Sequence, residues 1–253
     1  MPRASRYLLS GYTYHLTHRC HDRRFLLKFK EERERYREWL RIAVKRHGVS
    51  VFGYCITGNH THVVAYAHER EAIAQLMHLP SGAVAHHLNR RKRHEGSVWE
   101  HPYQCTIIQD GRHLLNCLRY VDLNMVRAGV VKHPEQWRWC GYDELVGARQ
   151  RYRLIDRARL RQHLDVPDDE SLARLHAERV QESITRRSLA RQPMWTEGLA
   201  VGSREYVEQA KKQYRFRAAF HEYPVDTGEQ EATWVVRESP SAYVADSWSK
   251  SAL

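Results

Sequence analysis

Hydrophobic and polar residues alternate with a period of two near the start of the chain and then with a helical period. Residues 12–18 alternate and are rich in β-forming side chains, which predicts a first strand. From Glu31 to His47, apolar side chains recur at three- and four-residue spacing before Gly48, a residue typical of helix ends. We therefore expect an amphipathic helix that packs on a sheet.

Two further β-rich runs, residues 49–57 and 61–66, flank Gly58-Asn59. A turn signal between two such runs predicts a hairpin in the middle of the sheet. Residues 69–94 again have a helical pattern, but Pro80-Ser81-Gly82 interrupts it and predicts two helical pieces with a break between them.

A predicted strand at residues 104–109 leads into a helix from His113 to Arg127, for which Gly129 is the expected stop. The order strand, helix, strand, strand, helix, strand, helix predicts an α+β fold of the ferredoxin-like kind. Its antiparallel sheet should carry helices mainly on one face. We assign this domain to residues 1–147.

Beyond Gly147 the pattern changes to strongly charged helical segments, so residues 148–223 are interpreted as a helical appendage. From Pro224 onward acidic residues outnumber basic ones, and serines and prolines accumulate. That composition predicts a disordered acidic tail over residues 224–253.

The 253-residue chain has 41 lysines and arginines against 30 acidic residues, a formal charge of +11. This balance favours a polyanionic partner, because basic side chains that neutralise phosphates release counterions. Nucleic acid is the leading hypothesis, with a membrane surface or simple solubility as alternatives. The sequence contains no apolar run of about 18 residues and no signal-like N-terminus, so we expect a cytoplasmic protein.

Five cysteines are scattered along the chain without Cys-x-x-Cys spacing. An odd number in this arrangement supports neither a disulfide framework nor a zinc ribbon. A zinc site that combines one cysteine with His60 and His62 is a less favoured alternative.

His60 and His62 are the first candidates for chemistry. If residues 61–66 form a strand that His60 leads into, the two side chains project from one face with Cβ atoms about 7 Å apart. Two imidazoles in that position can reach one ion. A His-x-His pair alone is a weak signal, since both can equally be surface or ladder histidines, but its position after a turn between two strands strengthens the metal hypothesis.

Tyr120 and Asn124 are the second candidate pair. In the predicted helix they lie one turn apart on the same face, about 6 Å along the axis, so a phenol and an amide are presented together. A single helical tyrosine is more often a core residue than a nucleophile. Its combination with the histidine pair favours a catalytic role.

His60-Thr61-His62, together with Tyr120, Asn124 and the following Val126-Arg127-Ala128-Gly129, resembles the IS200-like transposases. These are HUH single-strand nucleases with one tyrosine, and among them the sequence is similar to the REP-associated tyrosine transposases. The resemblance covers roughly residues 6–147 and implies the same α+β architecture.

The resemblance also implies a metal-dependent endonuclease and strand transferase that acts on single-stranded or hairpin DNA. Tyr120 would attack a phosphate, remain linked to its 5′ side, release a 3′ hydroxyl and reverse the step to join strands. A divalent ion, Mg²⁺ or Mn²⁺, would be held by His60, His62 and Asn124 and would stabilise charge on the scissile phosphate. Some relatives are dimers and others monomers, so both states stay open.

Basic residues near these motifs are candidates for contacts with the DNA backbone. The run from Arg90 to Arg93 ends a predicted helix, and its alternative interpretation is a solvated helix face. Trp99, His101 and Tyr103 beside it could stack on unpaired bases, although Trp99 is also a core candidate. The full set of basic candidates is Arg19, Arg23, Arg24, Arg90, Arg91, Lys92, Arg93 and Arg127.

Two other hypotheses compete with the transposase. A binding module for single-stranded or hairpin nucleic acid could keep the fold and the basic surface without catalysis, although the intact reactive residues argue against it. A metal-dependent hydrolase would use water as the nucleophile and leave no covalent adduct.

Overall fold

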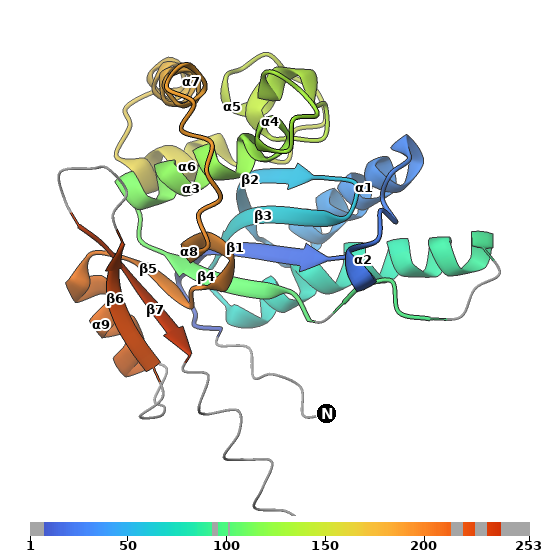
Figure 1. Cartoon of the computed structure of the whole chain (residues 1–253), viewed down its shortest axis with the longest axis horizontal. Coiled ribbons are helices and arrows are strands. Elements are labelled where there is room, and N and C mark those ends of the chain that lie inside the picture. The colour runs from blue at the N-terminus through green and yellow to red at the C-terminus, as the bar shows by residue number, and fades with distance from the viewer. Residues whose placement is uncertain (1–7, 93–95, 101, 214–219, 226–231, 239–253) are drawn as a thin grey trace, which may run out of the picture.

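The computed structural model describes residues 8–92, 96–100, 102–213, 220–225 and 232–238. Its centre is a seven-stranded sheet of order β2-β3-β1-β4-β5-β7-β6, and among these strands only β4 and β5 pair in parallel (Figure 1). The strands are β1 (Tyr12–Arg19), β2 (Ser50–Ile56), β3 (His60–Ala67), β4 (Gln104–Ile108), β5 (Ala200–Gly202), β6 (Phe220–Val225) and β7 (Thr233–Glu238).

The described helices alternate with these strands and then dominate residues 112–213. Within the described ranges, no helix is both long enough and apolar enough to cross a membrane. The helices are α1 (Lys30–His47), α2 (Arg70–Lys92), α3 (Arg112–Asp122), α4 (Asn124–Arg127), α5 (Tyr142–Leu145), α6 (Arg157–Leu164), α7 (Asp169–Thr185), α8 (Met194–Glu197) and α9 (Arg204–Gln213), with 3-10 turns at His21–Arg23 and Pro134–Gln136.

Helices cover both faces of the sheet. Thr61 and His62 are neighbours in β3 and therefore point to opposite faces. Thr61 donates a 3.1 Å hydrogen bond to the hydroxyl of Tyr36 in α1, whereas His62 lies 2.9 Å from Asn124 of α4 on the other face. The α+β class is confirmed, and so is the antiparallel pairing among the four strands β1, β2, β3 and β4. The prediction of helices mainly on one face is wrong.

The run Val63-Val64-Ala65 explains why the sheet is covered twice. All three side chains are fully buried, although they alternate between the two faces. A strand whose residues are apolar on both faces needs a helical layer on each. The layer on the α4 side includes α3, where Leu118 lies so close to Gly53 of β2 that a Cβ atom there would come within 2.6 Å of it.

The predicted break at Pro80-Ser81-Gly82 is wrong, because α2 is one helix with Pro80 inside it. Proline removes one backbone hydrogen bond and strains the preceding turn. Leu76, Val84 and Leu88 recur at helical spacing and are all buried against the core. Burial of this stripe offsets the cost of the proline and keeps the helix continuous.

The C-terminal part is also more than a helical appendage. β5 pairs with β4 through Ala200 and Val201, and β7 and β6 extend the sheet further, with α9 beside them at the orange and red end of Figure 1. The predicted disordered tail is therefore wrong for residues 232–238, where Val235 and Val236 are fully buried. The β-branched residues of this strand form only a short run among acidic residues. The acidic composition of the whole segment therefore predicted disorder. Residues 239–253 lie outside the described ranges.

Candidate active site

His60 and His62 lie at the start of β3, directly after the Gly58-Asn59 turn. Their ring centroids are 4.8 Å apart with the planes nearly perpendicular, so the predicted projection from one face is confirmed. His62 is almost fully buried, whereas His60 is partly exposed. The pair therefore forms the floor of a site that is open on the His60 side.

The hydrogen bonds of His60 determine which of its nitrogens is free. The Asn59 amide nitrogen donates to the carbonyl oxygen of Arg23 at 3.1 Å, so the Asn59 amide oxygen is the acceptor that faces His60 Nδ1 at 2.7 Å. His60 Nδ1 therefore carries the proton in the neutral ring. Its Nε2 keeps a lone pair.

A second chain of hydrogen bonds sets the tautomer of His62. The carbonyl oxygen of Trp195 can only accept, and it lies 2.7 Å from Nδ1 of His15, which must therefore be protonated. His15 Nε2 is then an acceptor, and it lies 2.8 Å from His62 Nδ1, which donates to it. His62 Nε2 is left with a lone pair that faces the site, as in metal centres where a second hydrogen bond orients the ligand.

Burial keeps all three rings neutral at physiological pH. It lowers the pKa of His15 to about 4 and the pKa of His60 to about 3, and it moves the pKa of His62 well below its ordinary value. The positive charge of Arg127 acts in the same direction on each ring. Neutral imidazole is the form that binds a metal ion.

Tyr120 and Asn124 approach the same point from the opposite side. The predicted continuous helix is divided at Leu123 into α3 and α4, yet the Asn124 amide nitrogen lies 2.9 Å from His62 Nε2. The Tyr120 ring stands nearly perpendicular to the rings of His62 and His15, with centroid distances of 6.2 and 6.3 Å. The structure thus brings together all four residues that the sequence predicted for catalysis and metal binding.

The donor set fits a hard or borderline divalent ion. His60 and His62 each offer an unprotonated Nε2, and rotation of the Asn124 amide exchanges its nitrogen for an oxygen donor. Nitrogen and oxygen donors of this kind suit Mn²⁺, or Mg²⁺ with water completing the octahedron. Among the described residues, no group of three or more His, Cys, Asp or Glu side chains is placed to hold an ion.

Positive charge surrounds the phenol of Tyr120. The Arg127 guanidinium lies 4.1 Å from the centre of the Tyr120 ring and donates a 3.3 Å hydrogen bond to the Tyr120 carbonyl oxygen. Burial raises the pKa of Tyr120, and Arg127, Arg191 and Arg19 oppose that rise. Arg19 also pairs directly across the sheet from His60. These cations can bind a phosphate and favour the phenolate.

The other predicted DNA contacts lie farther from the phenol. Arg23 and Arg24 are exposed on the segment that contacts Asn59, at the open side of the site. Arg91 makes a 2.8 Å ion pair with the buried Glu32 and a weaker one with Glu31, so part of the Arg90 to Arg93 cluster holds α2 against α1. Arg93 and His101 lie outside the described residues, and the DNA role of the cluster stays a prediction.

His15 and Trp195 are the site residues that the sequence argument missed. His15 was inside a predicted strand, but its contact with His62 depends on β1 being the neighbour of β3. Trp195 enters from α8, and no local pattern connects it with histidines more than 130 residues earlier in the chain. The one available signal was His15 itself, because a histidine at an inward-facing position of a predicted strand is a candidate for a buried polar site.

Two comparisons with known proteins found a similarity. Residues 9–124 match the family model described as "Transposase IS200 like", a range that contains both site histidines, Tyr120 and Asn124. A solved structure of a REP-associated tyrosine transposase bound to a REP hairpin is similar over 58% of this chain and 86% of its own, with 14% identity and a TM-score of 0.47. No curated protein matches the chain.

Proposed function

We propose, from the match of residues 9–124 to the family model described as "Transposase IS200 like", that this protein is a metal-dependent endonuclease and strand transferase for single-stranded DNA. Hairpin-containing DNA is the substrate to test first, as the resemblance implies. The observation that supports the proposal most is the convergence of Tyr120, Asn124 and the two histidines from segments about sixty residues apart in sequence.

Tyr120 is the proposed nucleophile. Its phenol oxygen bonds to the phosphorus as it loses its proton, the bond from phosphorus to the 3′ oxygen breaks, and that oxygen takes up a proton to leave as a hydroxyl. The product is a 5′ phosphotyrosine, which keeps the phosphoryl group activated for rejoining. The Arg127 guanidinium would favour the phenolate form, and Arg19, which pairs across the sheet from His60, would bind a phosphate oxygen.

His60, His62 and Asn124 are the proposed metal ligands. A bound divalent ion would supply positive charge to the scissile phosphate, which is the established contribution of metals to such displacements. The residues themselves contribute orientation: Asn59 holds His60, and His15 with the Trp195 carbonyl holds His62. Because these ligands are held before substrate arrives, the geometry is preorganised.

One experiment distinguishes the proposed strand transferase from the two alternatives, a hydrolase and a non-catalytic binding module. The protein is incubated with a single-stranded hairpin oligonucleotide and Mn²⁺ or EDTA, and the products are separated on a denaturing gel. A strand transferase gives a metal-dependent protein–DNA adduct and a free 3′ hydroxyl. Cleavage without an adduct supports a hydrolase, and binding without cleavage supports a non-catalytic binding module.

A further inference from the structure

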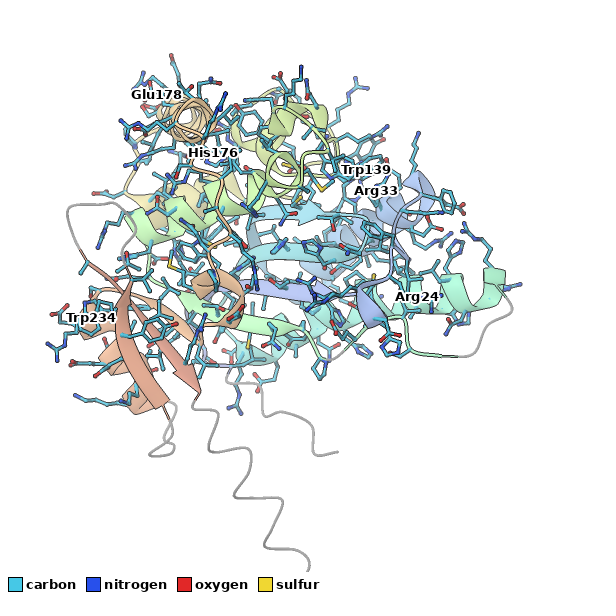
Figure 2. All side chains as sticks on the ribbon, viewed as in Figure 1. Arg24, Arg33, Trp139, His176, Glu178 and Trp234 are labelled. Carbon is cyan, nitrogen blue, oxygen red and sulfur yellow. The ribbon has the colours of Figure 1, made fainter. Side chains whose placement is uncertain are left out.

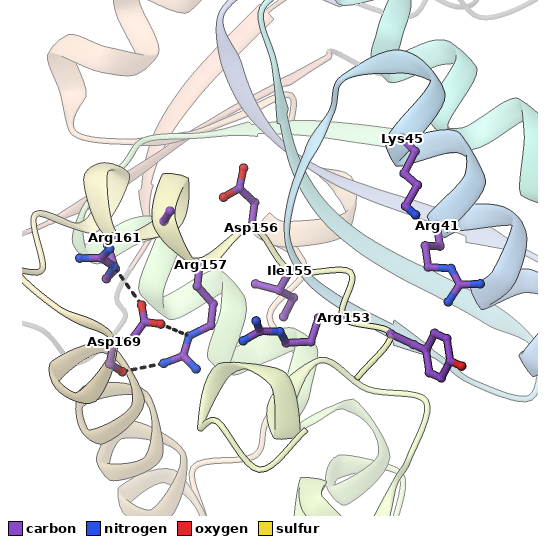
Figure 3. Close-up of a pocket in the computed structure, with 10 residues that line it drawn as sticks. Arg41, Lys45, Arg153, Ile155, Asp156, Arg157, Arg161 and Asp169 are labelled. Carbon is purple, nitrogen blue, oxygen red and sulfur yellow. Dashed lines mark hydrogen bonds and ion pairs between the residues drawn. The ribbon is translucent and has the colours of Figure 1, made fainter. Parts of the chain in front are cut away.

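A hollow of about 660 Å³ lies between α1 and residues 152–161 (Figure 3). Figure 3 shows Arg41 and Lys45 on α1 at one side and the arginines of the loop and α6 at the other. Five cationic side chains line the hollow against two carboxylates. The cations are Arg41, Lys45, Arg153, Arg157 and Arg161, and the carboxylates are Asp156 and Asp169.

Two neighbouring hollows continue this surface along α1. One of about 250 Å³ contains Arg37, Arg41 and Tyr152, and another of about 450 Å³ contains Arg37, Tyr152 and Arg138. Tyr152 lines all three, and we call the combined surface the Tyr152 groove. Arg37, Arg41 and Lys45 are four residues apart, so they follow one face of α1 at steps of about 6 Å.

Both carboxylates of the 660 Å³ hollow are already engaged, whereas the neighbouring hollows add Glu34 and Asp143, which pair with Arg37, Arg138 and Arg149, and Glu38. Asp169 pairs with Arg161 at 3.0 Å and with Arg157 at 3.5 Å, and Asp156 accepts a 2.7 Å hydrogen bond from the hydroxyl of Ser50. Within the described part of the chain, Arg41, Lys45 and Arg153 have no carboxylate at ion-pair distance. Three cations therefore remain available to an anionic ligand.

Tyr152 is the second observation that indicates a ligand. Its side chain is 74% exposed, and its φ of +55° is a conformation that a bulky residue rarely adopts. The Arg41 guanidinium lies 5.1 Å from the centre of its ring. Strain of this kind persists where the surroundings hold it, and it is concentrated at functional sites.

A buried carboxylate holds the loop in this conformation. Glu144 is fully buried and accepts hydrogen bonds from the backbone nitrogens of Leu154 and Ile155 at 2.6 and 3.0 Å. The Asp156 nitrogen is bonded to the carbonyl oxygen of Val51 in β2. The exposed ring of Tyr152 therefore sits on a fixed backbone next to the free cations.

We propose that the Tyr152 groove binds an unpaired DNA segment, with a base stacked on Tyr152 and backbone phosphates on Arg41, Lys45 and Arg153. Cationic grooves with an exposed aromatic face are the usual sites for single strands, because every base can stack and every phosphate can pair. A duplex stem would use the cations but leave the ring without a role. The choice of DNA as the ligand rests on the proposed function.

The groove is distinct from the cleavage site. The part of the groove that holds Arg41, Lys45 and Arg153 adjoins β2 at Val51, which is bridged to Ile155, whereas β2 ends near the site at Ile56, paired with Thr61. Five residues of extended strand separate these points by roughly 17 Å. The groove therefore binds DNA several nucleotides away from the scissile phosphate.

Fluorescence anisotropy with dye-labelled oligonucleotides tests this proposal in full-length protein carrying Tyr120→Phe. Because that chain cannot form the phosphotyrosine, the measurement does not depend on cleavage. The triple variant Arg41→Ala, Lys45→Ala, Arg153→Ala should bind a long single strand at least tenfold more weakly. In a plot of log affinity against log salt concentration, the slope of this variant should be smaller in magnitude by about 2, which is the contribution of three neutralised phosphates of a single strand. A matched variant with three exposed cations removed elsewhere, Arg174→Ala, Arg186→Ala, Lys212→Ala, should change both quantities less.

Tyr152→Asn separates stacking from structure. Asparagine tolerates a positive φ, so this variant should melt at the same temperature as the parent or higher. Loss of the ring should nevertheless weaken single-strand binding about tenfold. Tyr152→Phe keeps the ring and should bind like the parent.

Two results would overturn the proposal. If the triple variant weakens duplex and single-strand binding equally while Tyr152→Asn has no effect, the groove holds a duplex stem. If neither variant differs from the matched control, the groove is a solvated surface. Failure of the proposed function would show separately, as wild-type protein that forms no adduct.

Discussion

At the scale of single residues, the state of His62 depends on a carbonyl group in another part of the chain. The Trp195 carbonyl fixes the proton on His15, His15 fixes the proton on His62, and the lone pair of His62 faces Asn124. Partners that orient a metal ligand typically change metal affinity by 10- to 100-fold. His15 is therefore a positioning residue for the proposed metal site.

His15→Phe should weaken Mn²⁺ binding by about 10- to 100-fold, because His62 then loses the nearer acceptor for its Nδ1 proton, at 2.8 Å, and keeps only the Thr17 hydroxyl at 3.2 Å. His15→Gln offers an amide oxygen at that point and should recover part of the loss. Titration calorimetry measures the affinity, and ¹⁵N chemical shifts of the imidazoles report the His62 tautomer. Equal affinities and an unchanged tautomer in His15→Phe would contradict the positioning role.

Burial of neutral His15 also predicts an acid-sensitive fold. The unfolded ring binds its proton near pH 6.5, whereas the folded pKa is about 4, so the unfolded state holds more protons between these values. The stabilisation is therefore complete above about pH 6.5 and is lost as the pH falls toward 4. Between these two pH values, His15 alone should change the free energy of unfolding by something on the order of 3 kcal/mol.

Urea denaturation of the metal-free protein at pH 7 and pH 4.5 measures this loss. His15→Gln removes the titrating group, so its stability should fall less over the same interval. The same acid sensitivity in both proteins would assign the effect to other groups.

The individual site residues were predictable to different degrees. His60, His62 and Tyr120 have local spacing that a sequence shows directly, and the alternation of a strand places the two histidines on one face. His15 required knowledge of strand order, and Trp195 required the position of a distant helix. Contacts that depend on tertiary arrangement leave no periodic trace in the sequence.

At the scale of elements, a buried pair joins α3, the helix that carries Tyr120, to the C-terminal helices. His176 projects from α7 toward α3 (Figure 2), and its Nε2 lies 2.7 Å from a carboxylate oxygen of Asp122. Both side chains are about 1% exposed. Asp122 is two residues from Tyr120, so α7 supports the helix that carries the proposed nucleophile.

His176→Ala should lower the free energy of unfolding by about 3 to 5 kcal/mol, because it leaves the Asp122 carboxylate buried without this partner. Glu182→Ala on the same helix breaks only an exposed pair with Arg186 and should cost about 0.5 kcal/mol or less. Urea denaturation of both variants gives the comparison. Similar losses in the two would show that the buried pair does not dock α7.

Some helices and strands were predictable from sequence patterns, and others were not. The first strand, the α1 helix and the hairpin around Gly58-Asn59 follow from periodicity and turn residues. Pro80 predicted a break that burial of the surrounding stripe overrides. β5 to β7 are too short to produce a clear alternation, and they become strands only because β4 offers an edge to pair with.

At the scale of the whole molecule, the sheet crosses the boundary predicted at residue 147. β5 pairs with β4, α8 contributes the Trp195 carbonyl to the site, and α7 holds α3. The C-terminal part therefore belongs to the same structural unit as the candidate site.

A chain that ends at Gly147 should lose cooperative unfolding or become several kcal/mol less stable, since Ile107 and Ile108 lose their neighbouring strand and Asp122 loses His176. Removing one buried partner of such a pair alone costs about 3 to 5 kcal/mol. Circular dichroism during urea denaturation measures the change. A truncated chain that unfolds cooperatively and binds Mn²⁺ like the full chain would establish residues 1–147 as an independent domain.

The central claim is that Tyr120 forms a covalent bond with DNA, and mass spectrometry of the denatured reaction tests it most directly. Full-length protein is incubated with Mn²⁺ and a hairpin oligonucleotide labelled at its 3′ end, then digested, and the modified peptide is identified. We expect the downstream DNA on Tyr120 in wild type and in the control Tyr142→Phe, and none in Tyr120→Phe, which should still bind the oligonucleotide equally well. An adduct that persists in Tyr120→Phe, or cleavage without any adduct in wild type, would contradict the account.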